Sequence, residues 1–411
     1  MKRAGAAAVV AAVGVWLANS ACSLPLSNGG TAGLGGKGPV KVALVDVFSG
    51  NSGYSYMGPY LKNSLQVEID DLNAAGGLLG MQIQLVTADD GYDLTRTPEV
   101  VRQVLSDRAV KLLVGPSFAG LYLGAKPLIE HAQVPNCVTA MAADDVMRTA
   151  RFTFRAQEAD SARLGALLSY VRKNTQIKKV GLIADDDGVG HGYDGQLSDQ
   201  AGKAGLQYIG AAFVASTGDH KAQVQQMLQR GAEAVILSSD PSTAGKTLQA
   251  IKLLNATTRL KAFGFNSLAS YDWVQQVGDA ARGVIFGSTV EAYLSDVPEA
   301  RWSPAYRNFS KQVLTRYGTA PNGVEMQGIA AGADCITQWA KAVQAARDFD
   351  GMHVVKAWET LDIPAADSVL GVREQFSNTE HDAIPPDGLC IYQWVKNGDR
   401  WGLRLLAGPG G

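Results

Sequence analysis

Apolar, β-rich runs alternate with helical patterns along most of this chain. Between residues 40 and 141 the runs are VKVALVDV, QIQLVTAD, KLLVGP and VPNCVTAM. The pattern restarts at residue 178 with KKVGLIAD, LQYIGAAFV, AEAVILSS and LKAFGF. Strands that alternate with helices at this spacing are typical of parallel sheets with helices on both faces. Two consecutive sets predict an α/β chain with two similar lobes rather than one very large sheet.

The segments between these runs predict helices. Three fall in the first set and three in the second, over residues 61–74, 98–105, 121–131, 193–204, 221–229 and 244–254. Many of the 46 glycines stand where a run passes into a helical segment, and such tight turns need glycine.

The first residues predict export from the cytoplasm. Lys2 and Arg3 precede an apolar Ala/Val run that ends at Ala18, as in a secretory signal peptide. The run is too short for a comfortable membrane span, so it is expected to be removed. Residues 23–38, rich in Gly, Ser and Pro, are expected to form a flexible tether.

The end of this signal resembles the cleavage site of a bacterial lipoprotein. Ala21 directly precedes Cys22, which would become the lipid-modified first residue of the mature chain. Asn19 stands where such sites usually have Leu, and ordinary secretory cleavage nearby is the alternative. We therefore expect residues 1–22 to hold the signal peptide and Cys22 to anchor the protein to the outer face of a membrane.

Composition and charge indicate a globular protein and give no sign of a nucleic acid partner. The 411 residues are 46% hydrophobic, which is enough for a core and for more than one domain. The chain has 37 Lys and Arg against 39 Asp and Glu, for a net charge of −2. Because there is no basic excess, no nucleic acid partner is expected.

The cysteines indicate no metal site. Without Cys22, an odd number remains: Cys137, Cys335 and Cys390, which cannot all pair. Each lies among apolar residues, which favours small buried hydrophobes over a disulfide, although two of them could pair. Their spacing matches no zinc pattern, and no metal is expected.

A glycine-rich stretch after one strand run matches a dinucleotide fingerprint. Residues 190–195, GHGYDG, fit G-x-G-x-x-G. However, the three carboxylates of residues 185–187 would lie beside the pyrophosphate, where negative charge is unfavourable. The next run also ends without the acid that would hold the ribose. The glycines therefore predict a turn that leads into a helix, and no cofactor is expected.

A second stretch, residues 115–119, is one residue short of the hydrolase motif G-x-S-x-G. Ala119 replaces its last glycine, and Ser117 would need a base. None of the five histidines comes with a strand-end carboxylate that would complete a triad. The stretch therefore favours a strand-end loop that lines a crevice, in a protein that is not an enzyme. A secreted serine hydrolase that uses Ser117 is the less favoured alternative.

Four segments together resemble a known family: VKVALVDVFSG, IDDLNAAGGLLGMQIQLVTADD, VKLLVGPSFAG and GYDGQLSDQAGKAG. They resemble substrate-binding proteins of branched-chain amino acid type ABC importers, the Leu/Ile/Val-binding-protein-like members of the type I periplasmic binding fold. The resemblance extends from Val40 to about Trp401. It implies two doubly wound parallel-sheet lobes joined by three hinge strands, with a small ligand trapped between them and passed to ABC permease subunits. A receptor-type sensor of the same fold is the alternative, but no apolar span follows the lobes in this sequence.

The resemblance also implies lobe boundaries. Lobe one would comprise residues 40–156 and 287–374, and lobe two residues 157–285 and 388–405. The hinge segments would lie near residues 155–160, 286–289 and 376–384.

Site residues implied by the resemblance lie on strand-end loops, since ligands of open parallel sheets bind outside the carboxyl ends of strands. Family members that bind amino acids use hydroxyls where this chain has Ala119 and Ala143, and a glutamate where it has Asn266. The first loop is longer than usual and brings two tyrosines near the mouth. The candidate ligand contacts are Tyr54, Tyr56, Ser117, Phe118, Ala119, Met141, Ala142, Val189, Asp240 and Asn266.

These substitutions remove groups that would recognise a zwitterion. Leucine, isoleucine and valine are therefore expected to bind weakly, because a buried ammonium or carboxylate without partners is costly. A neutral polar or amide-bearing ligand is favoured, since Asn266 can both donate to it and accept from it.

Overall fold

A computed structural model describes residues 38–50, 54–55, 57–269, 271–289, 299–317 and 324–408. Within these ranges only the backbone is described at residues 145, 266, 272, 301 and 324–328. The expected signal peptide, the lipid site at Cys22 and the candidate Tyr56 lie outside the described residues, as does the expected tether except for Gly38.

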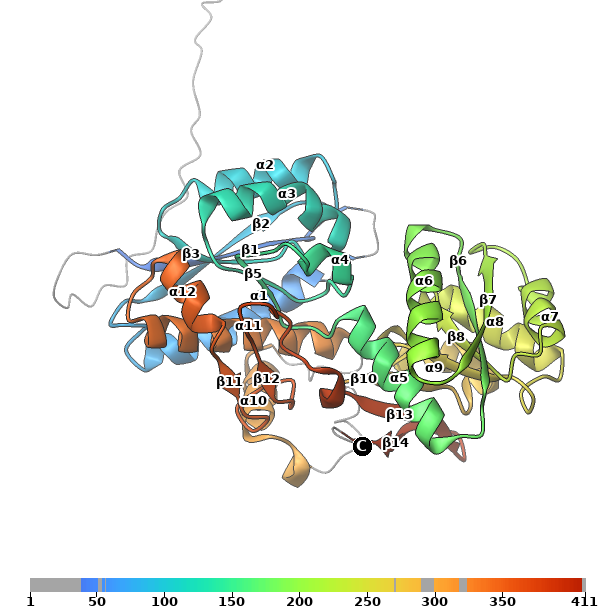
Figure 1. The fold of residues 1–411 in the computed structure, drawn as a ribbon. Helices are drawn as coiled ribbons and strands as arrows, with labels where there is room; N and C mark the ends of the chain where they lie inside the picture. The colour runs from blue at the N-terminus through green and yellow to red at the C-terminus, as the bar shows by residue number, and fades with distance from the viewer. Residues whose placement is uncertain are drawn as a thin grey trace, which may run out of the picture. The chain divides into compact units, whose positions relative to one another are not determined.

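Five parallel strands form the first sheet, in the order β2-β1-β3-β4-β5. They are β1 (Val40–Asp46), β2 (Ile83–Asp89), β3 (Val110–Val114), β4 (Asn136–Val138) and β5 (Thr153–Arg155). Helices cover both faces, which is why the inner strands read as continuous apolar runs. In Figure 1, α2 (Arg96–Leu105) and α3 (Ala119–Ala132) lie over one face, and α1 (Met57–Ala74) and α11 (Val324–Ala346) lie over the other.

Later helices complete the layer around α1. The long helix α11 packs along α1 and against α12, and α10 also packs on α1. A short helix, α4, follows strand β4. The bounds of these helices are α4 (Asp144–Met147), α10 (Pro304–Tyr317) and α12 (Gly351–Trp358).

Seven strands form the second sheet, in the order β14-β13-β10-β9-β8-β6-β7. They are β6 (Lys179–Asp185), β7 (Gln207–Val214), β8 (Ala234–Ser238), β9 (Lys261–Gly264), β10 (Ile285–Ser288), β13 (Cys390–Asn397) and β14 (Arg400–Ala407). The strands β6, β7, β8, β9 and β10 are parallel, whereas β13 and β14 add an antiparallel edge. The associated helices are α5 (Asp160–Asn174), α6 (Gly188–Lys203), α7 (Lys221–Gln229), α8 (Pro241–Leu253) and α9 (Tyr271–Val277).

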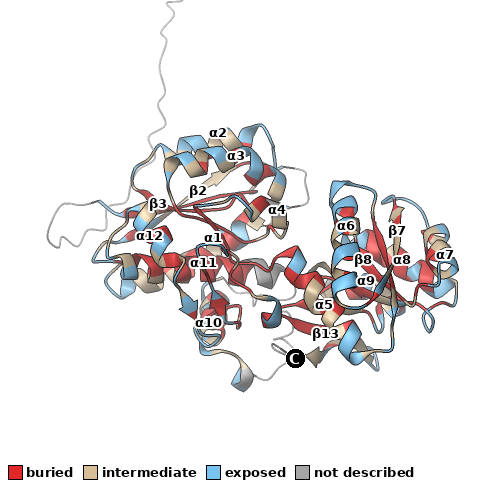
Figure 2. Cartoon of the chain, viewed as in Figure 1, coloured by how far each residue is buried: buried red, intermediate tan, exposed pale blue. Residues whose placement is uncertain are grey.

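Both sheets have the parallel, helix-covered build that the alternating runs predicted, and buried residues follow their strands (Figure 2). The predicted helices correspond to α1–α3 and α6–α8, but α1 begins at Met57 rather than at residue 61. Its first turn packs on the end of β1, where a Cβ on Gly58 would lie 2.7 Å from the carbonyl oxygen of Val47. Apolar periodicity marks only the buried face, so it missed this glycine-containing turn.

The chain passes between the two sheets three times, after β5, after β10 and before β13. Near the last passage, a two-stranded sheet pairs β11 (Asp362–Ile363) with β12 (Glu374–Gln375). The lobe boundaries stated above stay a prediction. Among the helices that the structure describes, none has the length and apolar character that a membrane span requires.

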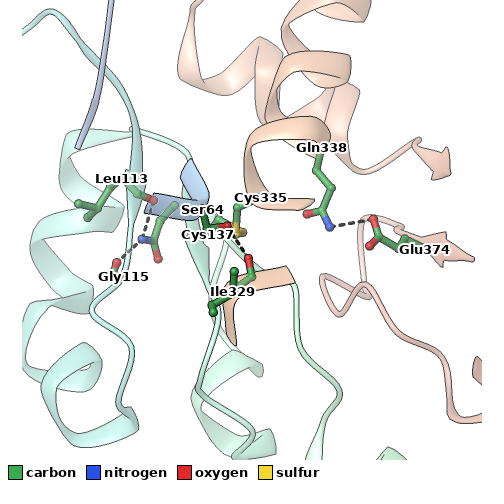
Figure 3. Close-up of a disulfide and its surroundings, with 9 residues drawn as sticks. Ser64, Leu113, Gly115, Cys137, Ile329, Cys335, Gln338 and Glu374 are labelled. Atoms are coloured by element: carbon green, nitrogen blue, oxygen red, sulfur yellow. Dashed lines mark hydrogen bonds between the residues drawn. A yellow bond between two sulfur atoms is a disulfide. The ribbon is translucent and has the colours of Figure 1, made fainter. Parts of the chain in front are cut away.

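The expectation that all three late cysteines are simple buried hydrophobes was wrong for two of them. Cys137 and Cys335 form a disulfide that joins β4 to α11, with their Cα atoms 5.9 Å apart (Figure 3). They are 198 residues apart in the sequence, so no local spacing could indicate the bond. Cys390 lies buried in β13 and takes no part in it.

A buried polar cluster lies beside the same helix. The Asp334 carboxylate accepts hydrogen bonds from the backbone N–H groups of Val369 and Leu370, both 2.8 Å long. Gln338 Nε2 donates to Glu374 over 2.8 Å (Figure 3), and the Ser368 hydroxyl contacts both carboxyl groups. Burial raises the pKa of Asp334 and Glu374, and the charge of Asp334 raises that of Glu374 further. The pKa of Glu374 therefore lies well above its usual value in the folded protein.

We expect loss of the disulfide to destabilise the first sheet and its helices. The Cys137→Ala/Cys335→Ala double variant should lose about 2–5 kcal/mol of unfolding free energy, because the bond closes a long loop of the unfolded chain. Denaturant unfolding of the parent with and without reductant should reproduce this loss. Cys390→Ala, measured with and without reductant, is the control. Reductant that leaves the parent's midpoint unchanged would contradict the prediction.

Stability should fall as the pH rises above the ordinary Glu value of 4.5, because folded Glu374 keeps a proton that the unfolded chain releases. The slope contributed by one group is at most about 1.4 kcal/mol per pH unit. Glu374→Gln, which resembles the protonated acid, should flatten thermal stability between pH 5 and pH 8. Glu99→Gln, on the exposed face of α2, is the matched control. Equal slopes for parent and Glu374→Gln would count against this assignment.

Candidate functional site

Three aromatic rings meet at the carboxyl edge of the first sheet. Tyr54, Tyr92 and Phe118 come from the loops after β1, β2 and β3, which are neighbouring parallel strands. The ring centroids are 4.7 Å apart for Tyr54 and Phe118, 4.9 Å for Tyr92 and Phe118, and 5.3 Å for Tyr54 and Tyr92. Tyr54 is 39% exposed and Tyr92 is 40% exposed. This aromatic triad therefore presents ring surface where parallel-sheet proteins bind ligands.

The carboxylate of Asp89, the last residue of β2, braces two of these loops. Its Oδ1 accepts backbone N–H groups of Phe48 (2.9 Å), Ser49 (3.2 Å) and Gly91 (3.0 Å), and the Ser49 hydroxyl donates to Oδ2. Partial burial opposes ionisation, but the hydrogen bonds from Ser49, Phe48 and Gly91 outweigh it and hold the pKa of Asp89 below its usual value. The ionised side chain thus ties the loop after β1 to the loop after β2.

Tyr92 has a left-handed backbone, with φ of 59°, which non-glycine residues rarely adopt. Its N–H donates to Oδ1 of the buried Asp90 over 3.0 Å. Asp93 then accepts the N–H groups of Thr95 (2.8 Å) and Arg96 (3.1 Å) at the start of α2. Sequence reasoning missed Tyr92, although it follows the Ala88–Asp90 motif by two residues, a strand-end position that could have indicated it.

A buried pair, Asp46 and Ser117, fastens the loop after β3. Asp46 accepts the N–H of Val47 over 2.7 Å and the hydroxyl of Ser117. Burial raises the pKa of Asp46 to about 7, against the effect of these hydrogen bonds. A Cβ on Gly115 would lie 2.1 Å from the carbonyl oxygen of Val45, so only glycine allows this close approach. Ser117 is 1% exposed, and its hydroxyl bonds to a carboxylate rather than to a histidine, which gives the hydrolase alternative no support.

Carbonyl groups of the loop after β4 accept hydrogen bonds from Arg155, at the end of β5, and from Asp160, at the start of α5. The buried Arg155 donates through NH1 to the carbonyls of Met141 (3.2 Å) and Ala143 (3.0 Å). The N–H of Asp160 donates to the carbonyl of Ala142 over 2.8 Å. The carbonyls of Met141, Ala142 and Ala143 are therefore turned toward Arg155 and Asp160. The side chain of Met141 is buried, and that of Ala142 is half-buried.

The Arg155 side chain also binds the third crossing segment. Its Nε and NH2 donate to the two carboxylate oxygens of Asp382 over 2.7 and 2.6 Å. Backbone hydrogen bonds of 2.9 Å join Arg155 N to His381 O and Ala383 N to Arg155 O. The end of β5 and this crossing segment are therefore held as one unit.

Candidates on the second sheet are placed differently. Val189 is exposed in the first turn of α6. Asp240 caps α8, since its Oδ1 accepts the N–H groups of Ser242 (2.8 Å) and Thr243 (3.1 Å). Asn266 begins a short 3-10 helix after β9, and its side chain is outside the description. The structure thus brings together Tyr54 and Phe118, and the half-buried Ala119 directly follows Phe118. The Asp240 carboxylate instead has a structural task as a helix cap.

No group of three or more His, Cys, Asp or Glu side chains among the described residues is arranged to hold a metal ion.

Comparisons with known proteins identify the class and the family of this chain. The family model described as periplasmic binding protein matches residues 39–399, so the chain belongs to the periplasmic binding protein family. Leu/Ile/Val-binding protein homolog 8 of Brucella abortus (strain 2308) is 23% identical over 375 residues, which cover 86% of this chain and 89% of that protein. Membership implies an extracytoplasmic location, and members are binding proteins rather than enzymes.

Solved structures share the fold. The branched-chain amino acid transporter substrate binding protein LivJ from Streptococcus pneumoniae, in complex with isoleucine, has a TM-score of 0.68 and 19% identity, and covers 90% of this chain and 99% of its own. An ABC transporter solute binding protein from R. palustris, in complex with 4-hydroxybenzoate, has a TM-score of 0.72 and 15% identity, and covers 91% and 98%. The predicted fold class and family are confirmed.

Proposed function

We propose that this protein captures a small solute between its two lobes and delivers it to the permease of an ABC importer. The observation that supports this best is the aromatic triad of Tyr54, Tyr92 and Phe118, which is half-exposed at the carboxyl edge of the first sheet. It is braced by buried or hydrogen-bonded carboxylates and faces the place where such folds bind ligands. The protein acts by binding and release, without turnover.

The ligand of this proposal is not a branched-chain amino acid. Ala119 and Ala143 offer no hydroxyl, and Asn266 offers no negative charge for an ammonium group. Asp240, the nearest substitute for that charge, uses its carboxylate to cap α8. The structural neighbours carry isoleucine in one case and 4-hydroxybenzoate in another, so the fold accommodates either kind of molecule. A largely neutral, polar solute fits the side chains of this chain best.

The proposal extends to the membrane. Cys22, after the apolar run of residues 4–18, would carry the lipid, and residues 23–38 would tether the folded body to it. A diacylated cysteine gives durable anchoring, whereas a single chain gives only marginal binding.

A thermal-shift screen of small metabolites on the chain from Ser23 onward tests the binding function. At one hundred times its dissociation constant, a ligand should stabilise the folded protein by about 2.7 kcal/mol. Leucine should give little or no shift at millimolar concentration, and Asn266→Asp should strengthen its binding by restoring a negative charge. Micromolar leucine binding that Asn266→Ala abolishes would refute the ligand argument. If no metabolite of any class shifts the transition, the binding function itself fails.

Fractionation of cells that express the Cys22→Ser variant tests the anchor. The parent should sediment with membranes, and the variant should move to the soluble extracytoplasmic fraction. Asn19→Leu, which restores the usual lipoprotein residue, should stay with the membranes and serves as the control. A Cys22→Ser variant that is as tightly membrane-bound as the parent would show that lipidation is not the anchor.

A further inference from the structure

We infer that the solute bound here carries a planar aromatic ring, held against the aromatic triad of Tyr54, Tyr92 and Phe118. This inference rests on the proposed solute-binding function and names the chemical class of its ligand.

The triad is more exposed than the ring contacts of the hydrophobic core. Phe154 and Trp358, for example, stack 4.3 Å apart and are both fully buried, as expected for core packing. Tyr54 is 39% exposed and Tyr92 is 40% exposed, so both leave ring surface open to solvent. Exposed apolar side chains that lie together, rather than scattered singly, are a feature of ligand-binding sites.

The loops are built so that the rings keep their places. Asp89 fastens the first loop to the second, and Asp46 fastens the third through Ser117. Tyr92 keeps an unfavourable left-handed backbone, and Asp90 holds its N–H. Strained backbone of this type persists where the surrounding structure over-determines it, and it clusters at binding sites. The rings of Tyr92 and Phe118 are therefore positioned before any ligand arrives, which lowers the entropic cost of binding.

The mutual angles of the rings suit a planar partner. Tyr92 stands edge-on to Phe118 at 85°, while Tyr54 is tilted by 50° to Phe118 and by 35° to Tyr92. A flat ring can stack on one member and meet the edge of another, the two arrangements that aromatic pairs prefer. A branched aliphatic side chain has no face to offer and gains only the burial of its surface.

Polarity at the site agrees with an uncharged or weakly polar aromatic solute. Asp46 and Asp89 are committed to N–H and hydroxyl donors of the protein. Partial burial and the nearby Tyr54 raise the pKa of Tyr92, so its hydroxyl remains a neutral donor. The Tyr92 hydroxyl can therefore hydrogen-bond to a hydroxyl, amide or carboxyl substituent on the ring of the solute, and no ion pair is needed.

Calorimetry of the mature protein with matched probes tests the inference. The probes are benzamide, benzoate and phenylalanine, each beside its saturated counterpart: cyclohexanecarboxamide, cyclohexanecarboxylate and cyclohexylalanine. In at least one pair the aromatic member should bind about tenfold tighter or more, as expected for one to two ring contacts. The saturated partner matches its size and charge, so the difference isolates the ring.

Variants assign this preference to the triad. Tyr92→Asn removes a ring while tolerating the left-handed backbone, and Phe118→Leu removes another with little loss of volume. Each should lower the preference for the aromatic member about two- to tenfold, whereas Tyr92→Phe should keep it. Tyr170→Leu, at a half-buried tyrosine of α5, is the control and should leave both affinities unchanged.

The outcomes separate the two levels of the proposal. If a saturated probe or another non-aromatic metabolite binds as tightly as every aromatic probe, or if Tyr92→Asn and Phe118→Leu both leave the preference intact, the ring inference is overturned and solute binding stands. If neither the probes nor the wider metabolite panel binds the parent, the proposed function falls, and this inference falls with it.

Discussion

The buried guanidinium of Arg155 holds together the segments on which the arrangement of this protein depends. It binds both carboxylate oxygens of Asp382 on the last crossing segment and two carbonyls of the loop after β4. Removing one partner of a buried ion pair costs several kcal/mol, because the remaining charge is left uncompensated. The end of the first sheet, a candidate ligand loop and a chain crossing are therefore fastened at one point.

Carboxylates at the strand ends serve the backbone rather than a ligand. Asp46 and Asp89 fasten loops of the first sheet, and Asp187 and Asp240 cap helices of the second. Orphan N–H groups at helix starts and in tight loops need such acceptors. With these acids occupied, the exposed rings of Tyr54 and Tyr92 are the parts of the triad that a solute can contact at this edge of the first sheet. The aspartates thus hold the backbone, and the aromatic rings are left as the proposed contacts to the solute.

Part of the site could be predicted from the sequence. Strand-end loops can be located from apolar runs alone, which is why the sequence is enough to make Tyr54 and Phe118 candidates. Asp240 shows the limit of that reasoning. Its position after a strand suited a ligand contact, but Pro241 and the following helix make it a cap. Tyr92 was missed because its local sequence does not indicate that its ring contacts those of Tyr54 and Phe118.

Local periodicity by itself determined the α/β class and the division into two sets of strands, because burial repeats every two residues in strands and every 3.6 in helices. The family was indicated by the resemblance of four sequence segments. Only the tertiary structure decided which side chains meet. The strand order β2-β1-β3 brings the aromatic triad together, and the packing of α11 near β4 joins Cys137 to Cys335. These contacts depend on strand order and loop conformation over long sequence separations, and a local pattern carries no information about either.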